Sequence, residues 1–183
     1  MKFHFGAIII IFVSILGIIL FTLTPVISGK DSIYFDANNW TNTRIIAFGF
    51  GNGRQDSEGE ILGFPFDNSV NLDINDWSEA FPIYVPILVM IGLAFSIIAG
   101  VLFLVADIKT TKNIAILLGI LGGACALAGI MSFLQWGQWF LSSADIGFYN
   151  VGFFGVVIAS AAVLFLSVVY VFNKSKGKKG VVF

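Results

Sequence analysis

The sequence predicts an all-α transmembrane four-helix bundle with a small extracellular antiparallel β-sheet, formed mainly by the first outer loop. Three observations lead to this fold class. The chain contains four long apolar stretches, one large polar segment lies between the first and the second, and most basic residues fall at one end of the stretches. The composition agrees, because 57% of the residues are hydrophobic and 11% are charged, whereas a soluble domain carries about 25% charged residues.

The apolar stretches define the spans and make residues 1–183 a single membrane domain. About 20 apolar residues in a helix cross a hydrocarbon core of roughly 30 Å. The predicted spans are Ala7–Ile27, Ile83–Ala106, Ile114–Trp136 and Val151–Phe172. The segment Met1–Gly29 also has the outline of a signal peptide, but its apolar core exceeds the usual length of about 7–15 residues. We therefore expect the first span to be retained, with cleavage as the alternative.

The basic residues predict the orientation, since lysine and arginine collect on the cytoplasmic side of a membrane. Seven of the ten basic residues would lie on one side: Lys2, Lys109, Lys112, Lys174, Lys176, Lys178 and Lys179. The segment 28–82 then faces outside, and the basic tail, 173–183, faces inside. The sequence predicts a multi-pass protein of the cell membrane with both termini in the cytoplasm.

Small residues recur at helical spacing in three of the spans and predict close helix packing, because small side chains let helix backbones approach in lipid. They are Gly92, Ser96 and Gly100 in the second span, Gly119 and Gly123 in the third, and Gly155 and Ala159 in the fourth. A specific dimerisation face is the alternative interpretation. The first span is mostly Ile, Leu and Phe, and we expect it to present much of its surface to lipid or to a partner helix.

The long polar segment reads as strands and turns. Strands are predicted at Ser32–Phe35, Arg44–Phe50, Gly59–Phe64 and Val70–Ile74, because these stretches are rich in aliphatic and aromatic residues. Asn52-Gly53 predicts a two-residue hairpin turn and Asp67-Asn68 a second turn. Asp73–Glu79 is expected to form a short helix. The second outer loop, Leu141–Asn150, either adds an edge strand or caps the bundle.

The polar segment carries a net charge of 3 − 9 = −6, and its densest acidic stretch contains Asp56, Glu58 and Glu60. We take these three residues as candidates for binding a protein partner. A solvated turn and a calcium site are the alternatives, although the spacing does not match that of a calcium-binding loop.

Nothing in the sequence predicts catalysis, a cofactor or a metal centre. Ionisable residues are absent from the middle of the spans, and proton relays and coupled transporters need such residues at depth. Haem binding between helices needs paired histidines, whereas His4 is the one histidine in the sequence; we expect it to be inert. Cys125 is expected to be a small packing residue. The sequence therefore indicates a protein that is not an enzyme.

Aromatic residues gather near the predicted outer interface: Trp77, Tyr84, Trp136, Trp139, Phe140 and Tyr149. Interfacial anchoring explains them, because such rings favour the headgroup layer. A groove for a sterol or carotenoid in the outer leaflet is the sharper alternative.

The outline of the chain resembles the claudin-like tetraspan superfamily, which includes the claudins, peripheral myelin protein 22, auxiliary γ subunits of channels and the fungal Sur7/PalI proteins. The shared plan has four spans, both termini inside, a long first outer loop that forms a sheet, a short second loop and a basic tail. The resemblance concerns architecture alone. The claudin motif in the first loop is absent, since Trp40 is the one tryptophan before Trp77, no Gly-Leu-Trp occurs and the loop lacks cysteine.

Two function classes follow from these features. The first is a structural or interaction protein whose extracellular sheet binds another membrane or extracellular protein, or a second copy of itself. The second is an accessory subunit of a larger membrane complex, such as an oxidase, oxygenase or channel, without cofactor ligands of its own. The lipid bilayer is the common partner, and we expect no nucleic-acid partner.

The predicted topology can be tested by accessibility on intact cells. We expect Asn52→Cys to react with an impermeant thiol reagent and Thr111→Cys to stay unlabelled, because the first lies in the outer loop and the second between the basic residues of the inner turn. Labelling of Thr111→Cys without labelling of Asn52→Cys would contradict the topology.

Overall fold

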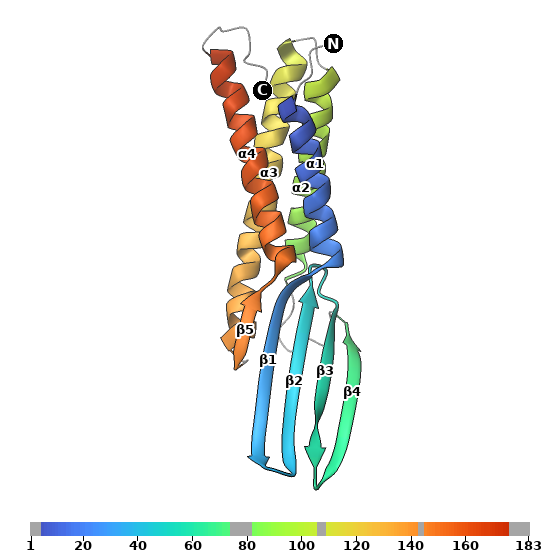
Figure 1. Cartoon of the computed structure of the whole chain (residues 1–183). Coiled ribbons are helices and arrows are strands. Elements are labelled where there is room, and N and C mark those ends of the chain that lie inside the picture. Colours follow the sequence, from blue (N-terminus) through green and yellow to red (C-terminus); the bar gives the residue numbers. More distant parts are fainter. Residues whose placement is uncertain (1–4, 74–81, 106–108, 143–144, 176–183) are drawn as a thin grey trace.

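The computed structural model describes residues 5–73, 82–105, 109–142 and 145–175 (Figure 1). Its helices are α1 (Phe5–Leu23), α2 (Tyr84–Val105), α3 (Lys109–Ser142) and α4 (Val151–Ser175). Within the described residues, four helices are long and apolar enough to cross a membrane: Phe5–Leu23, Tyr84–Val105, Thr110–Gln138 and Val151–Phe172. The chain therefore has the helices of a multi-pass membrane protein.

The helices run alongside one another, and α1 and α3 each contact both α2 and α4 (Figure 1). Their inner faces enclose a core built from Phe21, Val89, Leu93, Ile130, Phe133 and Val156. In α1 the buried positions are Ala7, Ile10, Ser14, Gly17 and Phe21, a spacing of three and four residues that marks one helix face. The opposite face of α1, which includes Phe12, Ile15 and Leu16, is exposed as the sequence predicts.

α1 ends at Leu23, short of the predicted end at Ile27. Proline at position 25 cannot donate a backbone hydrogen bond, and it disfavours helical geometry in the residue before it. The last helical hydrogen bond at this end of α1 runs from the Thr24 amide to the Leu20 carbonyl, at 3.1 Å. The apolar residues Val26 and Ile27 stay buried, but in a strand.

α3 is longer than its predicted span of 114–136. Its 34 residues correspond to about 51 Å, well beyond the roughly 30 Å of a hydrocarbon core. The excess at its C-terminal end reaches alongside the sheet, where Gly137 lies against Tyr149 and Ile27 (Figure 1).

The described strands form one antiparallel sheet in the order β4-β3-β2-β1-β5. Four strands come from the first long segment: β1 (Pro25–Asp36), β2 (Asn39–Phe48), β3 (Gly53–Ile61) and β4 (Phe64–Leu72). The second loop supplies β5 (Ile146–Tyr149), which pairs with Ile27–Lys30 of β1. The sheet extends from the ends of the helices roughly along their direction, away from the end at which α1 begins and α4 ends (Figure 1).

Both predicted turns are wrong. The first reversal begins before Asn52-Gly53, because the chain turns through residues 49–52 and Gly53 already pairs with Ala47 in the sheet. Gly51 takes the positive φ of 80°, and the Phe48 amide donates to the Asn52 carbonyl at 2.9 Å. Asp67 and Asn68 lie inside β4. The turn between β3 and β4 is instead Leu62-Gly63, where φ is 54° and 80°, and it falls inside the predicted strand Gly59–Phe64.

The turn at Leu62-Gly63 is fixed by the neighbouring hairpin. The Leu62 amide donates to Asn39 Oδ1 at 2.9 Å, and the Gly63 amide donates to the Asn38 carbonyl at 3.2 Å. Leucine rarely adopts a positive φ, which explains why sequence patterns do not reveal this turn. Of the predicted helix Asp73–Glu79, Asp73 is not helical and the remainder lies outside the described residues.

The predicted packing residues lie at contacts between helices. Gly92 and Ser96 face α3, Gly100 faces Ile11 of α1, and Gly155 faces Leu20 of α1. Gly119 and Gly123 face Ser167 and Leu164 of α4, and Ala159 is buried beside Gly17. Helices α2 and α3 also approach each other closely at Gly122. An added Cβ there would lie 2.6 Å from the Gly92 carbonyl and 2.8 Å from the Ser96 amide.

We expect Gly122→Ala to lower thermal stability in detergent, because the added methyl group meets backbone atoms of α2 that cannot move independently. Overpacking of this kind costs about 1–3 kcal/mol. Ala124→Leu is the control, since it adds more volume to the same helix at an exposed position. Equal melting temperatures for Gly122→Ala and the unchanged protein would contradict the packing of α2 on α3.

Candidate functional site

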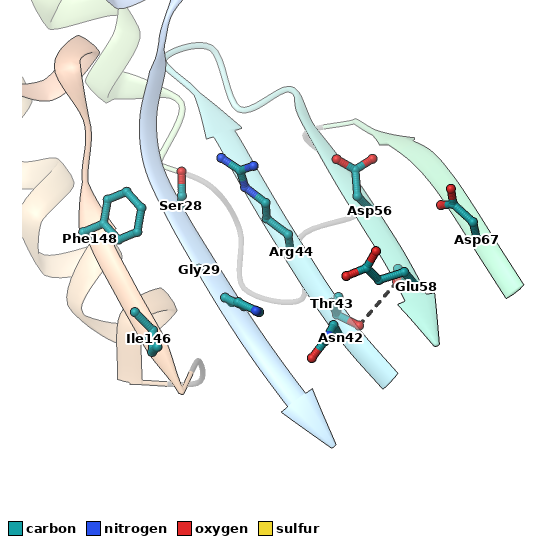
Figure 2. A pocket seen from close by; sticks show the side chains of 12 residues that line it. Ser28, Gly29, Asn42, Thr43, Arg44, Asp56, Glu58, Asp67, Ile146 and Phe148 are labelled. Carbon is teal, nitrogen blue, oxygen red and sulfur yellow. Dashed lines mark hydrogen bonds between the residues drawn. The ribbon is translucent and has the colours of Figure 1, made fainter. Parts of the chain in front are cut away.

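Most charges of the strands gather on one face of the sheet, which we call the charged face: Lys30, Arg44, Arg54, Asp56, Glu58, Glu60 and Asp67. Asp31, which pairs with Thr43, lies on the other face. Side chains at positions i and i+2 of a strand point to the same face, and directly opposed residues of neighbouring strands share a face. Lys30 pairs with Arg44, and Arg44 with Asp56. Glu58 pairs with Asp67. Figure 2 shows Arg44, Asp56, Glu58 and Asp67 on the same side of the sheet.

Apart from Arg54, which lies on β3, the two signs of charge are separated across this face. Lys30 and Arg44 lie on the adjacent strands β1 and β2, whereas Glu58 and Asp67 lie on the adjacent strands β3 and β4. Like charges directly opposite one another destabilise a sheet. The pair Arg44–Asp56 is favourable, but Lys30–Arg44 and Glu58–Asp67 are not, and a sheet in which the signs alternated at every strand would be more stable. Folding alone therefore does not account for this pattern.

The ion pair on this face lies within β3, where Arg54 Nε donates to Asp56 Oδ1 at 2.6 Å. This hydrogen bond holds the pKa of the Asp56 carboxyl below its usual range, and a hydrogen bond from Ser69 acts in the same direction. In the described part of the chain, neither Lys30 nor Arg44 has a carboxylate within 4.0 Å. Their charges are therefore available to a molecule that docks on the sheet.

An open groove of about 450 Å³ runs over the charged face. Its lining changes from apolar on β5, through basic on β1 and β2, to acidic on β3 and β4 (Figure 2). The residues are Ser28, Gly29, Lys30, Asn42, Thr43, Arg44, Asp56, Ser57, Glu58, Asp67, Ile146 and Phe148. Such a surface offers ion pairs and hydrogen bonds to an extended partner. Among the described residues, no three His, Cys, Asp or Glu side chains are grouped to hold a metal ion.

The base of the sheet, which is the end that lies next to the helices, is fixed to them. On the opposite face from the charges, Ile27 and Ala47 are fully buried. The Tyr149 hydroxyl donates to the Leu134 carbonyl of α3 at 3.2 Å, and burial raises the pKa of this hydroxyl. Asn150 Nδ2 donates to Ser28 Oγ. These contacts hold β1 and β5 on α3 and so fix the position of the charged face.

The sequence candidates Asp56, Glu58 and Glu60 lie together on β3, so their interpretation as a solvated turn is wrong. Sequence reasoning missed the residues that neighbouring strands bring beside them, chiefly Lys30, Arg44 and Asp67. One pattern could have indicated the arrangement. Charged residues occupy every second position from Arg54 to Glu60, which is the period of a strand.

Comparison with models of known protein families gave no match. A comparison with curated proteins likewise gave no match. The described helices together with the antiparallel sheet fit a claudin-like architecture.

We expect Gly59→Ala to loosen the outer half of the sheet. An added Cβ would meet the Trp40 carbonyl and would lie 2.9 Å from the ring of Phe66, which pairs directly with Gly59. Ser57→Ala is the control, because it changes the same face of the same strand without adding volume. Limited proteolysis should cut the Gly59→Ala protein at least about fivefold faster, as expected for a cost of about 1–3 kcal/mol. Equal cleavage of both variants would contradict this pairing.

Proposed function

We propose that this protein is an integral membrane interaction protein of claudin-like architecture, which binds another protein through the charged face of an extracellular sheet. The observation that carries the proposal is the segregation of charge. Lys30 faces Arg44, and Glu58 faces Asp67, at a cost to the sheet itself. A docking partner of complementary charge would offset that cost.

The distribution of basic residues supports an outward-facing sheet. Lys109 and Lys112 begin α3 at the end of the helices that is far from the sheet (Figure 1). Of the basic residues of the tail, Lys174 lies in the last turn of α4, at the same end, and Lys176, Lys178 and Lys179 come after α4 in the sequence. The positive-inside bias would place this end, and both termini, in the cytoplasm.

The shape of the groove favours a protein partner over a small molecule. Small-molecule sites are concave and mostly apolar, and they bury most of the ligand. Here the groove is open and lined mainly by charged and polar side chains from the strands (Figure 2). Rim charges of this kind set the encounter rate and the selectivity between protein partners.

An accessory subunit of a larger membrane complex is the second candidate function. One observation favours it. Ala124 and Ala128 of α3 are exposed and lie one turn apart on the same helix face. Small residues at this spacing let another membrane helix approach closely. In this alternative, the helices would bind the complex and the sheet would have a secondary role.

Neutralisation of the acidic strand tests the main proposal. We expect the combined change Asp56→Asn, Glu58→Gln and Glu60→Gln to reduce capture of the partner after cross-linking on intact cells, because the charged face would lose the negative charges that complement the partner. Capture by the unchanged protein should also weaken as salt screens the charges. The control is Ala124→Leu, which alters the α3 surface alone. Reduced capture by Ala124→Leu but not by the triple variant would favour the accessory-subunit alternative and contradict the main proposal.

A further inference from the structure

The charged face is complementary to itself. The cations Lys30 and Arg44 form a basic half on β1 and β2, and the carboxylates form an acidic half on β3 and β4, so the boundary between the signs follows the line between β2 and β3. The one cation of the acidic half of this face, Arg54, is paired with Asp56 on its own strand. A symmetric dimer places the same patch of each copy against the other. The question is which symmetry axis would bring opposite charges together.

Two axes can stack the charged faces of two copies. An axis parallel to the strands, over the boundary between β2 and β3, exchanges the two halves of the face. It therefore places the basic half of each copy over the acidic half of the other. An axis across the strands keeps each half over its own counterpart, so that Lys30 and Arg44 would face the same cations of the second copy. The charge pattern selects the axis parallel to the strands.

The register of the sheet assigns the facing residues. Because Arg44 is opposite Asp56 within one chain, the selected axis places Arg44 of one copy over Asp56 of the other. The same operation places β1 of one copy over β4 of the other. Lys30 then lies over Ser69, one pleat from Asp67, which is within the reach of a lysine side chain. Each contact occurs twice, as an isologous interface requires.

This axis also suits two chains in one membrane. The strands run roughly along the helices, so an axis parallel to the strands lies close to the helix direction (Figure 1). Rotation about it leaves the helices of both copies pointing the same way. An axis across the strands would direct the helices of the two copies in opposite directions. The arrangement that satisfies the charges is thus the arrangement that one bilayer permits.

We propose that the partner of the charged face is a second copy of this chain in the same membrane, bound face to face about an axis parallel to the strands. This inference rests on the proposed function and names its partner. The cations Lys30 and Arg44 then find carboxylates across the interface. Stacked sheets lie about 10 Å apart, a distance that long charged side chains from both sides can bridge.

A charge exchange between two variants tests the inference. The acidic variant carries Lys30→Glu and Arg44→Glu, and the basic variant carries Asp56→Lys and Asp67→Lys. Full-length proteins with C-terminal donor or acceptor fluorophores are reconstituted in the same liposomes, and energy transfer measures their association. Each variant alone should associate at least about tenfold more weakly than the unchanged protein, because every contact becomes repulsive. An equimolar mixture of the two variants should restore association, since all contacts between them are complementary.

Further measurements keep the outcomes distinct. If limited proteolysis shows that a reversed variant is unfolded, the neutral variants Arg44→Gln and Asp56→Asn replace it, and they should weaken association and reduce its salt dependence. Absence of energy transfer for the unchanged protein, or failure of the mixture to exceed either variant alone, would overturn the inference. If that result is accompanied by charge-dependent capture of a different protein on cells, the proposed function stands and only the identity of the partner is wrong. Energy transfer between separate liposome populations, without transfer inside one population, would also overturn it.

Discussion

The need to satisfy backbone hydrogen bonds inside a bilayer accounts for the separation of the long apolar helices from the strands in this structure. An open sheet edge is not tolerated in hydrocarbon, so a protein of this kind forms its strands in other segments than those that cross the membrane. The change occurs at Pro25, where α1 ends and β1 begins. A similar junction joins β5 to α4. There the Asn150 amide donates to the Val26 carbonyl at 2.9 Å, and the Asn150 carbonyl accepts from Phe153 and Phe154.

The helices follow from the sequence because a bilayer demands long runs of apolar residues, and such runs are visible without knowledge of tertiary contacts. The end of α1 was harder to predict from the sequence, because apolar residues such as Val26 and Ile27 are equally compatible with a buried helix and with a buried strand. The turns were mispredicted because local propensity was overruled. The chain does reverse beside Asn52-Gly53, but through residues 49–52, and the turn expected at Asp67-Asn68 lies at Leu62-Gly63, where hydrogen bonds from the neighbouring hairpin hold a leucine at positive φ.

The candidate site was only partly predictable for a related reason. Asp56, Glu58 and Glu60 are close in the sequence, so their proximity needed no structure. The opposing pairs Lys30–Arg44 and Glu58–Asp67 depend on strand register, and register is set by the turns that the sequence did not reveal. A shift of one residue would have moved these side chains to the other face. The separation of charge therefore became visible only with the pairing of all the strands.

The opposed like charges place a condition on the rest of the fold. A sheet that carries Lys30 beside Arg44 and Glu58 beside Asp67 loses stability on its own, so its stability must come from elsewhere. The structure provides it at the base, where Ile27 and Ala47 are buried and Tyr149 is bound to α3. The opposed charges Lys30, Arg44, Glu58 and Asp67 lie farther along the strands than Ile27 and Ala47. Anchoring at one end thus leaves the outer part of the sheet free to present a charge pattern that is unfavourable alone and favourable against a complementary surface.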